Sequence, residues 1–239
     1  GKSTTLYTAL ELANDRRRKI ITIEDPVEYR IKGITQLQVN AEIGYTFATA
    51  LRSILRHDPD MILVGEIRDE ETARIAIQSA LTGHMVLSTL HTNSAVGAIT
   101  RLVDMGLEPF LIAASVRGLM AQRLVRRLCS HCAEPDMSDD AALHALLERF
   151  GLGAQASPRR AMGCTHCAHT GYFGRQAIYD LIELNSELGH QIAQGASEGQ
   201  LLSMLGPLAG QGLLRSGVMQ GAFGHTTLSE VIRATAGAQ

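Results

Sequence analysis

The stretch Asp58-Pro59-Asp60-Met61-Ile62-Leu63-Val64-Gly65-Glu66-Ile67-Arg68-Asp69 decides the fold class of this chain. Its unbroken apolar run has Asp-Pro before it and Gly, Glu and Arg after it, which predicts a strand buried on both faces of a parallel sheet. Ligands of open α/β sheets bind at the carboxyl ends of the strands, so Glu66 lies where its carboxylate could contact a metal-bound phosphate. The alternative is a core strand followed by a surface glutamate.

The first residues, Gly1-Lys2-Ser3-Thr4, match the end of the P-loop pattern G-x-x-x-x-G-K-[ST]. In that pattern glycine lets backbone N–H groups approach phosphate, lysine reaches the β- and γ-phosphates, and the hydroxyl ligates magnesium. A bare Gly-Lys-Ser can also be an ordinary helix start. The helix-compatible run from Thr4 to Leu10 and the acidic strand end downstream favour a phosphate site. Because the first half of the pattern and an initiating Met are missing, we expect a piece of a longer protein.

Length and composition limit the class of protein. With 239 residues, 45% of them hydrophobic, and a formal charge of −2, the chain can form one large domain and a smaller one. The near-neutral charge argues against a nucleic-acid binder that works by bulk electrostatics. No apolar run has the length of a membrane span, so we expect membrane contact only through a partner.

A second acidic strand end follows the β-rich run Lys19 to Ile23, at Glu24-Asp25-Pro26. The proline stops the strand and makes the two carboxylates a fixed acidic corner. One carboxylate could polarise an attacking water while the other orders magnesium or a loop. A plain acidic turn is the alternative.

Two arginines, Arg52 and Arg56, lie four residues apart in the stretch Thr46 to Arg56, whose apolar residues have helical spacing. They therefore share one helical face. Both could be solvated charges, or their guanidinium groups could meet phosphate or the carboxylates of a neighbouring subunit.

Two histidines, His84 and His91, frame another apolar run that predicts a buried strand beside the central one. Histidines at strand ends are usually hydrogen-bonded structural residues. The competing hypothesis is that this pair senses the terminal phosphate.

The four cysteines form two C-x-x-C pairs, a pattern that favours a metal site over disulfides in a cytosolic chain. Two thiolates from each pair can complete one tetrahedral ion, and a closed four-thiolate site is structural because no position remains for a substrate. His131 and His166 lie inside the pairs, and a ligand role for them is the less favoured interpretation. The predicted zinc ligands are Cys129, Cys132, Cys164 and Cys167.

The second half of the chain is predicted to be mainly helical and shows no catalytic pattern. We expect an apolar helix from Pro109 to Met120, a helix from Asp139 to Phe150, a short strand from Gln176 to Leu181, and a capped helix start at Thr226 to Glu230. These segments would brace the first half and expose contact surface.

Together these motifs resemble the C-terminal ATPase domain of the secretion superfamily that drives type II secretion and type IV pilus assembly, and the chain is most similar to its type II members. The resemblance covers essentially the whole chain. It is carried by Gly1 to Tyr7, Thr22 to Tyr29, Leu51 to Asp69, and Thr82 to Asn93.

The resemblance implies roles for individual residues. Gly1, Lys2, Ser3 and Thr4 would bind ATP, with Ser3 on Mg²⁺. Glu24 would orient or deprotonate the attacking water, and Glu66 would be the Walker B carboxylate. The family's histidine box corresponds to His84 and His91, and its arginines of subunit contact and transition-state charge correspond to Arg52, Arg56 and Arg68.

The implied fold class is α/β: a RecA-like P-loop NTPase core with a parallel-rich sheet at residues 1–128, a tetracysteine zinc module at 129–169, and a C-terminal helical subdomain at 170–239. The implied protein is a cytoplasmic ATPase with ATP, Mg²⁺ and Zn²⁺, acting as a homohexamer that powers type II secretion by pseudopilus assembly. Its partners would be cytoplasmic domains of inner-membrane secretion or pilus platform proteins, which would hold it at that membrane.

Three other functions stay open. The chain could be a type IV pilus assembly ATPase, or a zinc-bearing assembly module that has lost catalysis, although both Glu24 and Glu66 are retained. A RecA-like DNA motor is disfavoured by the near-neutral charge and few aromatics. Without the first half of the P-loop, this stretch of chain is expected to bind ATP weakly and to hydrolyse it negligibly.

Overall fold

The structure is a computed structural model, and it describes residues 1–138 and 141–236. The N-terminal half is built on a four-stranded parallel sheet in the order β2-β1-β3-β4. The strands are β1 (Ile20–Glu24), β2 (Thr35–Gln38), β3 (Met61–Val64) and β4 (Met85–Ser88). Every residue of β1 and β3 is buried, which confirms the predicted strand with two covered faces.

The fourth strand, β4, differs from its prediction as a buried strand. Met85 is 52% exposed, and the other residues of β4 are only half-buried. Within the described residues β4 pairs with β3 alone, so it forms an edge of the sheet. An apolar run shows that a strand forms but does not show how many neighbours the strand has.

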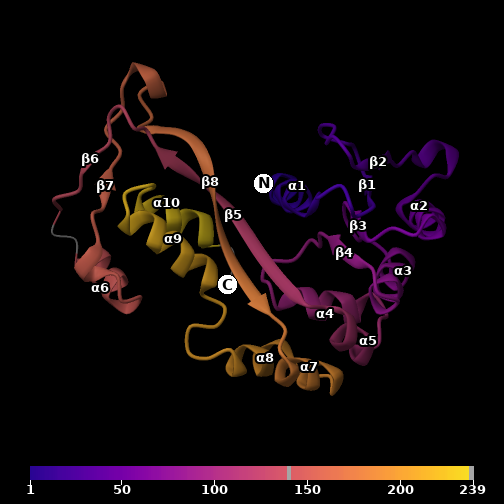
Figure 1. Ribbon diagram of the computed structural model, residues 1–239. Helices are drawn as coiled ribbons and strands as arrows, with labels where there is room; N and C mark the ends of the chain where they lie inside the picture. The colour runs from indigo at the N-terminus through magenta and orange to yellow at the C-terminus, as the bar shows by residue number, and fades with distance from the viewer. Residues whose placement is uncertain (139–140, 237–239) are drawn as a thin grey trace.

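Helices cover both faces of this sheet (Figure 1). Side chains alternate between the faces along each strand. Met61 and Leu63 pack against the first helix on one face, whereas Ile62 and Val64 pack with the second and third helices on the other. The helices of this half are α1 (Lys2–Ala13), α2 (Phe47–Ile54), α3 (Glu70–Leu81), α4 (Gly97–Asp104) and α5 (Pro109–Ser115).

Beyond the sheet, β5 (Gly118–Leu128) and β8 (Tyr172–Glu183) form a long antiparallel pair that runs past the start of α1 (Figure 1). The predicted helix from Pro109 to Met120 is therefore wrong after Ser115, because Met120 lies in β5. The partner strand is far along the chain, so no local pattern could reveal the pairing.

The short strand predicted from Gln176 to Leu181 is observed, but it is longer than predicted, because β8 has twelve residues. The pairing of β8 with β5 also joins residues of the predicted first and third units in one sheet. The unit boundaries at 128–129 and 169–170 remain predictions.

Two C-terminal helices, α9 (Gly212–Ala222) and α10 (Leu228–Thr235), cover one face of the β5–β8 pair (Figure 1). Val125 of β5 and Ile178 of β8 are fully buried beneath them. The other elements of this half are β6 (Glu134–Pro135), α6 (Ala141–Arg149), β7 (Arg159–Arg160), α7 (Ser186–Ala193) and α8 (Glu198–Met204).

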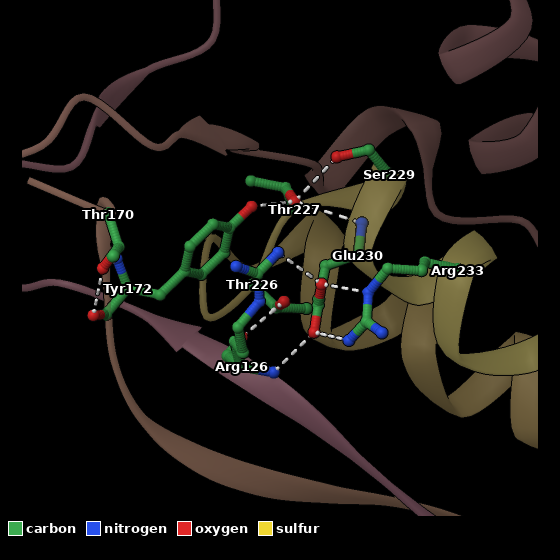
Figure 2. A network of polar contacts seen from close by, with 8 residues as sticks. All are labelled: Arg126, Thr170, Tyr172, Thr226, Thr227, Ser229, Glu230 and Arg233. Atoms are coloured by element: carbon green, nitrogen blue, oxygen red, sulfur yellow. Dashed lines mark hydrogen bonds and ion pairs between the residues drawn. The ribbon is translucent and has the colours of Figure 1, made fainter.

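A buried carboxylate fixes α10 to β5 (Figure 2). The side chain of Glu230 is 1% exposed and accepts hydrogen bonds from the Arg126 backbone N–H at 3.0 Å and its Nη2 at 2.8 Å. Arg233 donates to the same carboxylate through Nε at 2.9 Å and Nη2 at 2.6 Å. Thr227 caps α10 by accepting from the Glu230 N–H at 3.2 Å, which confirms the predicted capped helix start.

The helix predicted from Asp139 to Phe150 is observed as α6, although residues 139–140 lie outside the described residues. Within 1–138 and 141–236, no helix combines the length and the apolar composition that a membrane span needs. Short 3₁₀ turns occur at Ala41–Ile43, Leu55–His57, Gly153–Gln155 and Thr165–Cys167.

Candidate functional site

The carboxyl ends of β1 and β3 and the first turns of α1 enclose a cleft of about 190 Å³. Six residues singled out from the sequence line it together, although they come from four separate parts of the chain: Lys2, Ser3, Glu24, Asp25, Glu66 and His91. Parallel strands place their carboxyl ends on one edge of a sheet, which is why these residues meet.

Gly65 lets the ends of β1 and β3 approach each other. Its N–H donates to the carbonyl oxygen of Ile23 at 2.7 Å. A Cβ at position 65 would lie 3.2 Å from that oxygen and 3.4 Å from the Cα of Glu24. A side chain here would push the two acidic strand ends apart, so glycine is part of the architecture of the cleft.

Glu24 is 5% exposed and is held by uncharged donors. Its Oε1 accepts from the Thr22 hydroxyl and from Nε2 of Gln36 at 3.2 Å, and its Oε2 accepts from the Tyr7 hydroxyl. Within the described part of the chain, no arginine, lysine or histidine lies at ion-pair distance from it. Burying a carboxylate is costly unless its oxygens are hydrogen-bonded, and these three donors meet that need.

Glu66, in contrast, is held by an arginine and a histidine. Its side chain is 14% exposed, with Oε1 2.5 Å from Nη2 of Arg68 and Oε2 3.0 Å from Nε2 of His91. Burial acts to raise the pKa of Glu66, but the hydrogen bonds from Arg68 and His91 outweigh it and lower the pKa. Glu66 is therefore an ionised carboxylate that lines the cleft.

Two residues of this site, Tyr7 and Gln36, were not predicted as site residues from the sequence. Tyr7 lies four residues after Ser3 on α1, so helical spacing places both on one face, and that signal was available. Gln36 reaches Glu24 because β2 pairs with β1 in a register that sets Thr22 beside Gln36. No local pattern shows that register.

Other predicted residues lie outside the cleft lining. Arg52 pairs with Glu71 at 2.5 Å on the exposed surface, and Arg56 is exposed. His84 precedes β4 and so lies at the amino end of that strand, whereas His91 follows the carboxyl end. The Nδ1 of His84 is 2.9 Å from the carbonyl oxygen of Ser79.

The start of α1 also contacts β5. Gly1 and Thr4 belong to this start but do not line the cleft. The Thr5 hydroxyl donates to Oε1 of Gln122 at 2.8 Å, and a Cβ on Gly1 would lie 2.9 Å from the same side chain. The β5–β8 pair therefore touches the segment that carries Lys2 and Ser3.

The four predicted zinc ligands form one cluster. All four sulfur atoms lie within 4.8 Å of one another. The Sγ atoms of Cys129 and Cys164 are 4.0 Å apart, and those of Cys132 and Cys167 are 3.8 Å apart. Tetrahedral zinc with Zn–S bonds of about 2.3 Å requires sulfurs about 3.8 Å apart, so the cluster fits zinc.

Backbone donors point at the sulfurs of this cluster. The N–H groups of Cys164 and Gly171 lie 3.2 Å from Sγ of Cys167, and the N–H of Gly163 lies 3.3 Å from Sγ of Cys132. Burial acts to raise the pKa of the Cys167 thiol, but the two backbone donors lower it to about 6. At Cys167 these donors favour the thiolate, the form in which cysteine binds metal, whereas burial raises the pKa of Cys132 to about 11 despite the Gly163 donor. The rings of His131 and His166 stack on each other with centroids 4.1 Å apart, and the metal-ligand set of the described residues holds only the cysteines.

A helix that begins at Gly-Lys-Ser beside parallel strands with acidic carboxyl ends defines the class of protein: this is a RecA-like P-loop NTPase fold. The chain belongs to the family described as type II/IV secretion system protein, whose sequence model matches residues 1–233.

Curated relatives agree with this family. The chain is 52% identical over 237 residues to the type II secretion system protein E of Pseudomonas aeruginosa, covering 98% of this chain and 46% of that protein. It is 47% identical over 238 residues to the type II secretion system ATPase E of Vibrio cholerae, with the same coverage of 98% and 46%. The chain thus spans about half the length of the curated relatives it matches.

Solved structures show the same fold. The pilus retraction motor PilT, determined with bound ADP, superposes with a TM-score of 0.68 at 28% identity and covers 98% of this chain and 57% of its own. The ATPase DotB of Legionella pneumophila gives a TM-score of 0.66 at 23% identity, covering 97% and 56%, and supports the fold alone.

Proposed function

We propose that the chain carries the ATP-hydrolysing site of a motor subunit that powers type II secretion by pseudopilus assembly. One observation carries this proposal: Glu24 and Glu66 meet Lys2 and Ser3 in a single cleft at the carboxyl edge of the sheet. The relative from Vibrio cholerae is named an ATPase, and the PilT structure holds ADP, which supports the same activity here.

The residues of the cleft suit phosphoryl transfer to water. Lys2 and the N-terminal turn of α1 would bind the β- and γ-phosphates of ATP, because free backbone N–H groups and the lysine attract negative charge. Ser3 and Glu66 would hold magnesium, which neutralises phosphate charge when bound. Glu24 would orient the attacking water and accept its proton. The water oxygen bonds to the γ-phosphorus as the bond to the β–γ bridging oxygen breaks, giving ADP and inorganic phosphate.

The remaining site residues have secondary roles in this proposal. His91 touches Glu66, so it is the histidine placed to respond to the terminal phosphate. Arg68 neutralises Glu66 in this structure and could exchange that carboxylate for phosphate. Arg52, which pairs with Glu71, and Arg56 lie on the surface, where a neighbouring subunit of a hexamer could contact them. His84 is far from the nucleotide in this scheme, and its contact with Ser79 favours a structural role.

Type II secretion is favoured over pilus assembly because the relative named for it shares 52% of residues, against 28% for the pilus motor PilT. We propose that the motor works at the inner membrane from the cytoplasmic side, through the cytoplasmic domains of secretion platform proteins. We also propose one structural zinc ion on the four cysteines, supported by the spacing of their sulfurs.

The test uses the full-length protein and the variants Glu66→Gln and Glu24→Gln. Each variant removes a charge and keeps the shape, so ATP binding should be retained while turnover falls by about 10²-fold or more. Glu11→Gln, an exposed residue of α1, is the control and should keep normal turnover. Wild-type turnover in either cleft variant would show that the assigned residue does not act in hydrolysis.

The 239-residue chain alone is proposed to bind ATP weakly and to hydrolyse it negligibly. It lacks the first half of the P-loop pattern, whose backbone N–H groups would surround the phosphates. Calorimetric titration with ATP and magnesium, beside a version as long as the curated relatives, tests this. Equal affinity and turnover in the two proteins would contradict it.

A further inference from the structure

We propose that Tyr7 is a positioning residue for hydrolysis: its hydroxyl fixes one oxygen of Glu24, so that α1 links phosphate binding to the orientation of the proposed base. This inference rests on the proposed function and deepens it.

The contact between these two residues is buried. Tyr7 is 1% exposed, Glu24 is 5% exposed, and the Tyr7 hydroxyl donates to Oε2 of Glu24. The other carboxylate oxygen, Oε1, has two donors in Thr22 and Gln36. Within the described residues, Tyr7 is therefore the sole protein donor to Oε2, so the phenol fixes one end of the carboxylate while Thr22 and Gln36 hold the other.

The surroundings of Tyr7 keep its hydroxyl in the donor role. The backbone N–H of Glu28 donates to the phenol oxygen at 3.2 Å, and the ring of Tyr29 packs edge-on with centroids 4.6 Å apart. Burial, followed by the hydrogen bond to Glu24, raises the pKa of Tyr7 to about 12. The phenol thus stays protonated at any physiological pH, and its O–H can always donate the hydrogen bond to Glu24.

Tyr7 lies on the same helix as the proposed phosphate-binding residues. Lys2, Ser3 and Tyr7 all belong to α1, and all three line the cleft. A shift of α1 on binding phosphate would move the Tyr7 hydroxyl with it, and with the hydroxyl one oxygen of Glu24. The same helix that holds the substrate would then align the group that accepts the proton from water.

Removing only the hydroxyl should therefore affect turnover more than binding. In Tyr7→Phe the buried Oε2 loses its donor, so the carboxylate can turn away from the water. We expect kcat to fall about tenfold or more while KM and ADP affinity stay within about twofold. Tyr29→Phe is the matched control, because its ring packs on Tyr7 while its own hydroxyl makes no hydrogen bond within the described residues. It should behave as wild type.

A double-mutant cycle in the full-length protein tests whether Tyr7 acts through Glu24. If it does, the double variant Tyr7→Phe, Glu24→Gln should be no slower than Glu24→Gln alone. Multiplicative losses would overturn the inference, as would wild-type kcat in Tyr7→Phe. A loss of ADP affinity or of thermal stability that accounts for the lost turnover would also overturn it, since Tyr7 would then only support the helix.

A proton NMR readout separates this inference from the proposed function. A buried hydroxyl bonded to a carboxylate should give a slowly exchanging, downfield proton signal that is absent in Tyr7→Phe and displaced in Glu24→Gln. If the wild-type protein hydrolyses no ATP, the proposed function fails, and this signal still decides whether Tyr7 holds Glu24. Absence of the signal in the wild type would overturn the inference whatever the turnover.

Discussion

Arg126 and Glu230, which lie 104 residues apart in the sequence, are joined by two hydrogen bonds, from the backbone N–H at 3.0 Å and from Nη2 at 2.8 Å. The carboxylate is almost completely buried, so its burial depends on these donors and on Arg233. Removing the charge of Glu230 should therefore weaken the attachment of α10 to β5.

The first prediction is that Glu230→Gln destabilises the fold by about 2–3 kcal/mol. The amide keeps the shape, but it cannot accept from both guanidinium groups at once and leaves two cations without their buried anion. Urea unfolding measures the loss. Glu11→Gln, exposed on α1, is the control and should change stability little. Equal stability of the two variants would show that the network contributes nothing.

The second prediction concerns pH. Hydrogen bonds from Arg233 lower the pKa of Glu230 to about 2 from an ordinary 4.5, assisted by Arg126 and opposed by burial. Because the folded pKa is the lower one, this carboxylate stabilises the fold fully above about pH 4.5 and progressively less as pH falls towards 2. The shift corresponds to about 3 kcal/mol.

Urea unfolding at several pH values tests this expectation. The stability difference between the wild type and Glu230→Gln should be largest near neutral pH and should shrink as the pH is lowered from 4.5 to 2. A difference that stays constant across that range would contradict the depressed pKa.

The third prediction is one zinc ion per chain, lost together with part of the thermal stability in Cys129→Ser. Cys129 is buried, so the empty ligand position cannot be filled easily by water. Elemental analysis and thermal unfolding give the two readouts. His131→Ala should retain the metal, because this histidine stacks on His166 outside the ligand set. Purified wild-type protein without stoichiometric metal would show that the cluster is not a zinc site.

The fourth prediction is that Gly65→Ala lowers both stability and turnover. The new methyl group would lie 3.2 Å from the carbonyl oxygen of Ile23, tight enough to displace the end of β1 and with it Glu24. We expect a loss of about 1–2 kcal/mol and a fall in kcat. Gly199→Ala in α8 is the control, since its Cβ meets nothing within 4 Å and alanine favours helix. The proposed packing is wrong if both variants behave alike.

The sequence predicted the parts of the site that depend on local chemistry. The apolar runs of β1 and β3, the acidic residues after them and the paired cysteines are all local signals, and the structure has these elements where they were expected. Neighbours across the sheet were not predictable in this way. The pairing of β5 with β8, the exposure of Met85 and the contact from Gln36 to Glu24 all depend on which distant strands lie side by side.

The histidines show a difference that the sequence could have revealed. His84 precedes the predicted strand and His91 follows it. In a parallel sheet the residues after the strands meet at the carboxyl ends, so this order already favours His91 as the cleft residue. The structure agrees, because β4 runs parallel to β3 and His91 lines the cleft whereas His84 does not.

The hydrogen bond between Thr5 and Gln122 connects the start of α1 to the long β5–β8 pair. Gln122 touches the start of α1, and the strand continues six residues further to Leu128, about 20 Å at the usual rise per residue, where the cysteine cluster begins. Over this length, a rotation of about three degrees at α1, if the pair moved as a rigid body, would displace its far end by about 1 Å. The length of β5 would therefore set the size of the displacement near Cys129 that a movement of α1 could produce.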